Sequence, residues 1–124
     1  MTDALVIGGG PAGLMAADVL SSAGASVLVA DRMPTVGRKF LMAGKSGLNI
    51  TKDEPLGDFV RSYGQVDASF RDAIDAFGPE ETKHWATSLG QDVFTGSTGR
   101  VFPKSMKASP LLRSWLAKLE GVHQ

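Results

Sequence analysis

The chain has 124 residues, 43% of them hydrophobic, which is enough for one domain with a hydrophobic core. Its 13 basic and 13 acidic residues cancel, and a net charge of zero argues against a general binder of polyanions such as nucleic acid. It contains no cysteine, which excludes disulfides and thiolate chemistry within the chain. Its N-terminal apolar run is too short for a signal peptide or a membrane span, so we expect a cytoplasmic location.

A glycine-rich run over residues 6–13 closes a short apolar stretch and opens a helix. Ala4–Ile7 is apolar with β-branched residues, which predicts a buried parallel strand. Helix-forming residues follow from Leu14 to Leu20, and Gly24 is expected to end that helix. Ser26–Ala30 predicts a second strand. The fold class is therefore α/β, beginning with a Rossmann-like βαβ unit.

Each glycine of this motif has a physical task in phosphate binding. Gly8 permits a tight turn, Gly10 lets a pyrophosphate approach the backbone, and Gly13 lets the helix pack closely on the sheet. Pro11 suits a first helical position, where its missing N–H costs little. The helix N-terminus offers free N–H groups and a positive dipole end to phosphates. The alternative is a glycine-rich turn that binds no ligand.

An acid and a basic block follow the motif. Asp31 stands 23 residues after Gly8, near the spacing expected of an acid that binds a ribose hydroxyl. It suits the ribose of NAD as well as that of FAD, and it argues against a 2′-phosphate. Residues 32–52 then hold five bases and no acid. These bases either face phosphates or form a solvated loop.

Residues 33–52 are rich in glycine and polar residues and predict a long loop with one helical turn around Phe40. Three helices are expected after it. Leu56–Tyr63 is short, Asp67–Phe77 places aromatic and aliphatic residues on one face, and Pro79–Leu89 has acids in its first turn.

Asp92–Thr95 and Arg100–Pro103 flank a four-residue loop with two glycines, which predicts a β-hairpin. Ser109 and Pro110 are then expected to start a helix as N-cap and first helical residue. One side of that helix is apolar, through Leu111, Leu112, Trp115, Leu116 and Leu119.

Gly121 is expected to end this last helix, and Val122 to begin a further strand. A parallel sheet needs more strands than the two at the N-terminus. We therefore expect the chain to be a fragment of a longer protein, and we expect the isolated fragment to self-associate through exposed strand edges. His84 is expected to be a surface histidine and His123 a mobile chain end.

Further segments carry a resemblance to a known family. They are Gly37–Gly44, Gly47–Thr51, Gly99–Ser105 and Lys107–Ser109. Together with the glycine motif, they resemble the HI0933-like flavoproteins, which are NAD(P)/FAD-dependent oxidoreductases also called the aminoacetone oxidase family. The resemblance covers essentially the whole chain. It implies a Rossmann-like FAD domain, here incomplete, that an inserted domain interrupts.

The resemblance also implies roles for individual residues. The FAD pyrophosphate would lie against Gly8, Gly10, Ala12 and Gly13. Asp31 would hold the adenosine ribose, with Arg32, Arg38 and Lys39 along the adenosine and pyrophosphate side. The flavin side would include Gly44, Gly47, Asn49 and Thr51. From the residues alone, the alternative for Arg38 and Lys39 is a solvated pair, and the alternative for Asn49 is the cap of a turn. Trp85 and Trp115 are expected in the core.

These observations predict the N-terminal FAD-binding portion of a flavin-dependent oxidoreductase that carries out two-electron transfer on a small organic substrate. NAD(P)H is a possible electron donor to the intact parent. Residues 1–52 would form the FAD-binding βαβ unit with its flavin-side loop, and residues 53–124 a helical segment with a hairpin. The missing cysteine pair excludes a disulfide reductase. No catalytic residue and no metal site are assigned. The alternatives are a stand-alone nucleotide-binding or interaction module without catalysis, and an NAD-binding unit.

Overall fold

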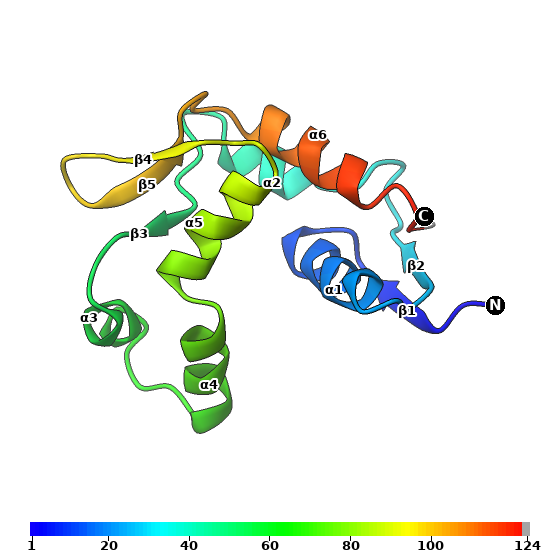
Figure 1. The fold of residues 1–124 in the computed structure, drawn as a ribbon, viewed down its shortest axis with the longest axis horizontal. Helices are drawn as coiled ribbons and strands as arrows, with labels where there is room; N and C mark the ends of the chain where they lie inside the picture. Colours follow the sequence, from blue (N-terminus) through cyan, green and yellow to red (C-terminus); the bar gives the residue numbers. More distant parts are fainter. Residues whose placement is uncertain (123–124) are drawn as a thin grey trace.

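The computed structural model describes residues 1–122, so the expectation for His123 lies outside the described residues. The chain forms a parallel strand pair at one end, a small antiparallel sheet at the other, and helices between and below them (Figure 1). In chain order the elements are β1 (Ala4–Ile7), α1 (Pro11–Ser22), β2 (Val27–Ala30), α2 (Arg38–Ala43), β3 (Thr51–Lys52), α3 (Leu56–Arg61), α4 (Ala68–Ala76), α5 (Pro79–Ser88), β4 (Val93–Thr95), β5 (Arg100–Pro103) and α6 (Ala108–Lys118).

The N-terminal βαβ unit is confirmed. β1 and β2 pair in parallel, from Ala4 opposite Val27 to Ile7 opposite Ala30. Helix α1 covers one face of the pair, where Ala17, Val27 and Val29 form a buried cluster. Because side chains alternate along a strand, the other face carries residues of β1 that stay exposed, with Ile7 84% exposed.

The predicted hairpin is also confirmed, but it belongs to a larger sheet. β4 and β5 pair antiparallel, and β3 joins the free edge of β5 to give the order β3-β5-β4. The expected helical turn around Phe40 is present as α2, but the expectation that the rest of residues 33–52 is loop is wrong at its end, where β3 lies. A two-residue strand is too short to show a period of two, and its partners lie about fifty residues further along the chain.

Three helices form the lower part of the molecule in Figure 1, as the sequence predicts. The Asp67 carboxylate caps α4 by accepting a hydrogen bond of 2.8 Å from the Phe70 N–H. In α5, Pro79 occupies the first turn and Gly90, with φ +79°, follows the end of the helix. His84 is exposed on α5, as expected.

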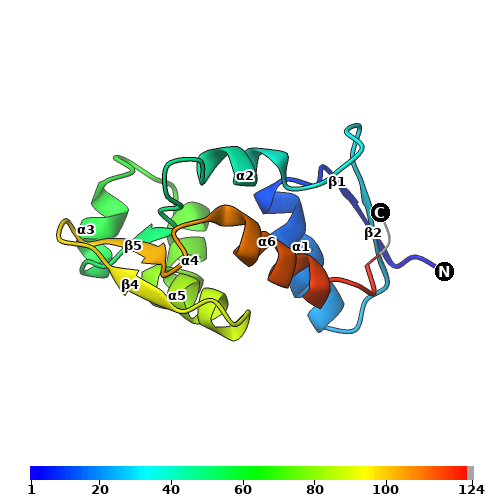
Figure 2. The ribbon, with the colours of Figure 1, turned by 90° about the horizontal axis from the view of Figure 1, so that it is seen from above.

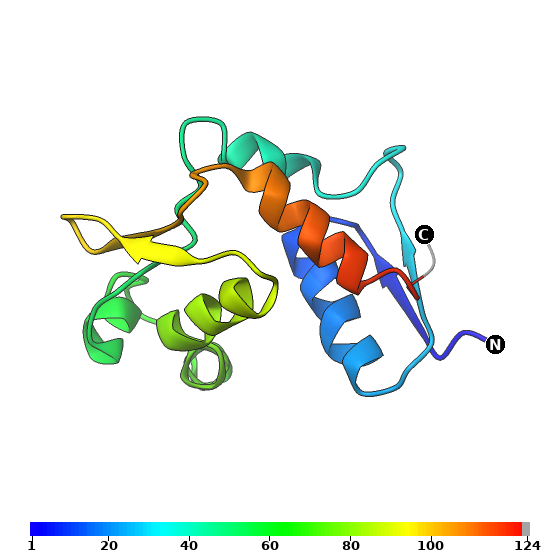
Figure 3. The ribbon, with the colours of Figure 1, turned by 45° about the horizontal axis from the view of Figure 1, so that its top comes forward.

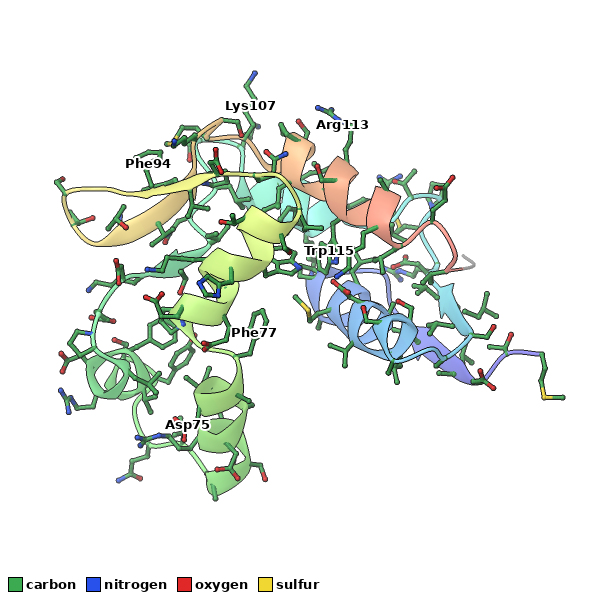
Figure 4. All side chains as sticks on the ribbon, in the orientation of Figure 1. Asp75, Phe77, Phe94, Lys107, Arg113 and Trp115 are labelled. Atoms are coloured by element: carbon green, nitrogen blue, oxygen red, sulfur yellow. The ribbon has the colours of Figure 1, made fainter. Side chains whose placement is uncertain are left out.

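Helix α6 returns to the N-terminal unit and lies beside α1 (Figures 2 and 3). Of the five residues expected on its apolar side, Leu111, Leu112, Trp115 and Leu119 are buried and Leu116 is half-buried. Figure 4 shows Trp115 directed toward α1, whereas Arg113 of the same helix points away from the molecule. Among residues 1–122, no helix is long and apolar enough to cross a bilayer.

Both ends of α6 differ from expectation. The helix begins at Ala108 with Lys107 as its N-cap, so Ser109 and Pro110 lie inside the first turn. Pro110 is tolerated there because the first N–H groups of a helix have no acceptor within it. At the other end the helix stops at Lys118 with Leu119 as its C-cap, two residues before the expected Gly121, and Val122 is not the start of a strand. Its N–H donates to the Leu119 carbonyl in a turn, and its side chain packs on the core.

Candidate functional site

The glycine loop between β1 and α1 has the geometry that its residues predict. Gly8 has φ +103°, a conformation that disfavours other residues. A Cβ on Gly13 would lie 1.8 Å from the Gly8 carbonyl oxygen, so the first turn of α1 touches the end of β1 directly. Only glycine at position 13 permits this contact.

The same loop leaves room in front of the helix N-terminus. Gly10 is the N-cap of α1, and a Cβ built on it would have no heavy atom of residues 1–122 within 4 Å, apart from its own neighbours in the chain. Pro11 is the first helical residue, as predicted. The N–H groups of Ala12 and Gly13 follow, in the turn whose donors lack acceptors within the helix. Backbone donors beside open space suit an anionic group.

Asp31 lies next to this loop at the end of β2. Its Oδ2 accepts a hydrogen bond of 2.6 Å from the Gly9 N–H, and its Oδ1 accepts one of 2.7 Å from the Met33 N–H. Hydrogen bonds from Met33 and Gly9 hold the pKa of the Asp31 carboxyl below its ordinary value. The carboxylate is therefore anionic at neutral pH.

A cavity of about 310 Å³, lined in part by charged residues, opens between the glycine loop and the segment after β2. Its lining combines backbone, one carboxylate and three cations: Gly9, Gly10, Asp31, Arg32, Met33, Thr35, Gly37, Arg38 and Lys39. Arg32, Arg38 and Lys39, the first three bases of the basic block, thus line the same cavity as the glycine loop. Three cations against one anion favour a negatively charged ligand.

A second, apolar cavity of about 510 Å³ lies beside the first turn of α1. Its walls are Pro11, Met15, Lys39, Phe40, Ala43, Leu48, Asn49, Ile50, Phe77, Thr82, Trp85 and Trp115. Lys39 lines both cavities, and the consecutive residues Gly10 and Pro11 line one each. The two cavities are therefore neighbours at the start of α1, with Lys39 of α2 lining both.

Of the four residues expected on the flavin side, Asn49 lines the apolar cavity. Its amide nitrogen also donates to the carbonyls of Thr51 and Val101, which ties the loop to β5. Gly44 packs on α6, where a Cβ would lie 2.5 Å from the Ala108 Cβ. Gly47 faces Met106, and Thr51 pairs with Val101 in the sheet. The flavin-side assignments remain predictions.

The two tryptophans belong to the core and also line the apolar cavity. Trp115 is 1% exposed and meets Trp85 edge-to-face, with ring centroids 4.8 Å apart, so its place in the core is confirmed. Trp85 is partly buried and closes one side of the apolar cavity. Sequence reasoning missed the cavity because its walls come from four helices and two connecting segments. Phe77 and Thr82 carry no local signal that points to it.

A parallel βαβ unit with a glycine loop, a helix N-terminus and an acid at the end of the second strand defines a Rossmann-type nucleotide-binding fold. The family description "HI0933-like protein Rossmann domain" matches residues 2–123. The chain belongs to this HI0933-like family.

A solved structure supports the fold. The crystal structure of Thermovibrio ammonificans THI4 matches with a TM-score of 0.57 at 20% sequence identity. The match covers 98% of this chain and 37% of that one, so the chain spans little more than a third of the length of the solved relative. At this identity the likeness concerns the fold alone.

Proposed function

We propose that this chain binds FAD as the N-terminal cofactor-binding part of a flavin-dependent oxidoreductase. The observation that carries the proposal is the pair of neighbouring cavities beside the glycine loop and the start of α1. FAD joins a polar, charged ADP half to a large apolar ring, and the two cavities offer those two environments on either side of Gly10 and Pro11. The family membership agrees with it.

Within this proposal each cavity has a task. The backbone N–H groups of Gly10, Ala12 and Gly13 would hold the pyrophosphate, with Arg38 and Lys39 contributing charge. Asp31 would bind the adenosine ribose, and Asn49 would face the flavin ring from the apolar side. Bound FAD would supply two-electron chemistry. The chain's residues hold and orient it, and the substrate would be a small organic molecule.

The proposal extends to the division of the chain, its location and its self-association. Residues 1–52 form the FAD-binding unit with its flavin-side loop, and residues 53–124 continue the domain. The protein works in the cytoplasm, with NAD(P)H as a possible electron donor. The isolated chain self-associates, which the 58% and 84% exposure of Leu5 and Ile7 beside unpaired strand edges supports.

The direct test is nucleotide binding by the chain and by Gly10→Val. We expect both ADP and FAD to bind the chain, FAD more tightly than ADP because its ring also fills the apolar cavity, and FMN, which lacks the ADP half, to bind far less than either. Gly10→Val should abolish binding of ADP and FAD, because the new side chain fills the space in front of the helix N-terminus. Titration calorimetry measures all three affinities.

Val19→Ser is the matched control, because it alters an exposed side chain on the same helix, near its C-terminal end. Circular dichroism shows whether each variant is folded. If Gly10→Val binds ADP as well as the control does, the glycine loop is not the phosphate site.

The oxidoreductase part of the proposal concerns the longer protein to which this domain would belong. We expect its flavin to be bleached anaerobically by NADH, NADPH or a small amine, and to recover in air. With no cysteine in the flavin-side loop, hydride transfer at the flavin remains. Flavin absorbance measures the change. A bound flavin that none of these donors bleaches would favour the non-catalytic alternative.

A further inference from the structure

The glycine loop is attached through Gly9 to the segment that follows β2. The Gly9 N–H donates to Asp31 Oδ2 at 2.6 Å, and the Gly9 carbonyl accepts from the Gly37 N–H at 2.8 Å. Both backbone polar groups of Gly9 are therefore bound within the chain itself. The segment over residues 31–37 holds the middle of the loop from both sides.

Close packing leaves this attachment little freedom. Gly9 is buried, and a Cβ on it would lie 2.4 Å from Val36 Cγ1. Gly37 has φ +74°, and a Cβ there would lie 2.8 Å from Leu112 Cδ2 in α6. The glycine loop, the segment after β2 and helix α6 are thus fitted against one another.

The Asp31 carboxylate binds two separate segments of the backbone, the glycine loop and the segment after β2. One oxygen accepts from the Gly9 N–H, 22 residues earlier in the chain, and the other accepts from the Met33 N–H, two residues later. Each carboxylate oxygen can accept a second hydrogen bond, so a ribose hydroxyl still has an acceptor. Bonds to the ionised group are stronger than bonds between neutral groups.

We propose that Asp31 positions the glycine loop before any nucleotide binds, and so supports every ligand that uses the N–H groups of the loop, with or without a ribose hydroxyl. The choice of ligands rests on the proposed function. The physical reason is preorganisation, because a loop that is already in its binding conformation loses less entropy when the phosphates arrive. Asp31 is in this respect a positioning residue.

The test compares Asp31→Ala and the isosteric Asp31→Asn with Asp3→Ala. Asp3 is a matched control, since its carboxylate accepts the Ser26 N–H at 2.9 Å at the opposite end of the same strand pair. Hydrogen exchange of the Gly9 amide, followed by NMR without nucleotide, measures the loop directly. Titration with ADP and with 2′,3′-dideoxy-ADP, which has no ribose hydroxyl, measures its effect on binding.

We expect Gly9 exchange to accelerate roughly tenfold or more in Asp31→Ala, the scale of a lost charge-assisted hydrogen bond. Affinity for 2′,3′-dideoxy-ADP should fall about tenfold, and affinity for ADP by at least that factor, because ADP also loses its ribose contact with Asp31. Asp31→Asn should lie between, because it keeps one acceptor oxygen, and Asp3→Ala should change neither readout.

The proposal is overturned if Gly9 exchange stays at the value of the Asp3→Ala control. It is equally overturned if only ADP binds more weakly, since that pattern describes a ribose contact alone. If Asp31→Ala does not fold, the same comparisons apply to Asp31→Asn. If the unaltered chain binds neither nucleotide, the proposed function fails, while Gly9 exchange still decides whether Asp31 holds the loop.

Discussion

Gly13→Ala is expected to unfold the N-terminal βαβ unit or to leave it strongly destabilised. The added methyl carbon would lie 1.8 Å from the Gly8 carbonyl oxygen and 2.9 Å from the Gly8 carbonyl carbon. Both atoms belong to the backbone at the end of β1, so no side-chain rotation relieves the clash. Helix α1 must move away from the strand, and its contacts with Val27 and Val29 weaken.

The expected loss of stability is about 3 kcal/mol or more, at the upper end of the effects of overpacking. Against a total stability of roughly 5–15 kcal/mol for a domain, this is a large fraction. Thermal unfolding followed by circular dichroism should show a melting temperature lower by roughly 10 °C or more. Loss of nucleotide binding would follow from the loss of structure.

Gly10→Ala is the matched control for this result. It adds the same methyl group three residues earlier, where the backbone is extended and no heavy atom lies within 4 Å. It should leave the melting temperature nearly unchanged while it weakens nucleotide binding. Equal melting temperatures for the two variants would mean that Gly13 is not needed for the contact between helix and strand.

The contrast between these two glycines shows what the sequence predicts well. A tight turn, an open approach and a close packing contact each demand glycine for local steric reasons, so Gly8, Gly10 and Gly13 could be given their tasks from spacing alone. Pro11 at the helix start follows from the same kind of rule. Local requirements of this sort leave their mark in a few adjacent residues.

Features that depend on distant partners were not predictable. Strand β3 exists because Thr51 meets Val101, and two residues carry no periodic signal. Asp31 was placed near the site by its spacing, but its hydrogen bond to Gly9 depends on the exact end of β2. The sequence predicts that α6 begins at Pro110, two residues later than it does, because Ser109 and Pro110 also fit inside the first turn of a helix.

The clearest long-range feature is a buried carboxylate that joins α1 to α6. Asp18 is 4% exposed, and Trp115 Nε1 donates to its Oδ2 at 3.0 Å. Lys118 Nζ donates to its Oδ1 at 2.6 Å, and Ser22 Oγ adds a bond of 3.3 Å. The residues near Asp18 in the sequence do not predict its partners Trp115 and Lys118, which lie 97 and 100 residues away.

Asp18→Ala is expected to lower the free energy of unfolding at pH 7 by about 2–3 kcal/mol, because it leaves the buried Trp115 N–H without an acceptor. Asp75→Ala is the matched control. It removes a carboxylate from an exposed pair with Arg71, and such surface pairs contribute well under 1 kcal/mol. Guanidinium unfolding, followed by circular dichroism, measures both variants.

The pH dependence separates the charge of Asp18 from its packing. Burial opposes the charge, but the hydrogen bonds from Lys118, Trp115 and Ser22 outweigh it and hold the pKa of the Asp18 carboxyl below its ordinary value. A folded pKa below the unfolded one stabilises the protein above the unfolded value of about 3.9, and this stabilisation is lost as the pH falls through the folded pKa. The difference in the free energy of unfolding between the unaltered chain and Asp18→Ala should therefore be largest near pH 7 and should decrease below about pH 3.9. A difference that stays constant over this range would assign the role of Asp18 to packing, and the joint between α1 and α6 would not depend on its ionised carboxylate.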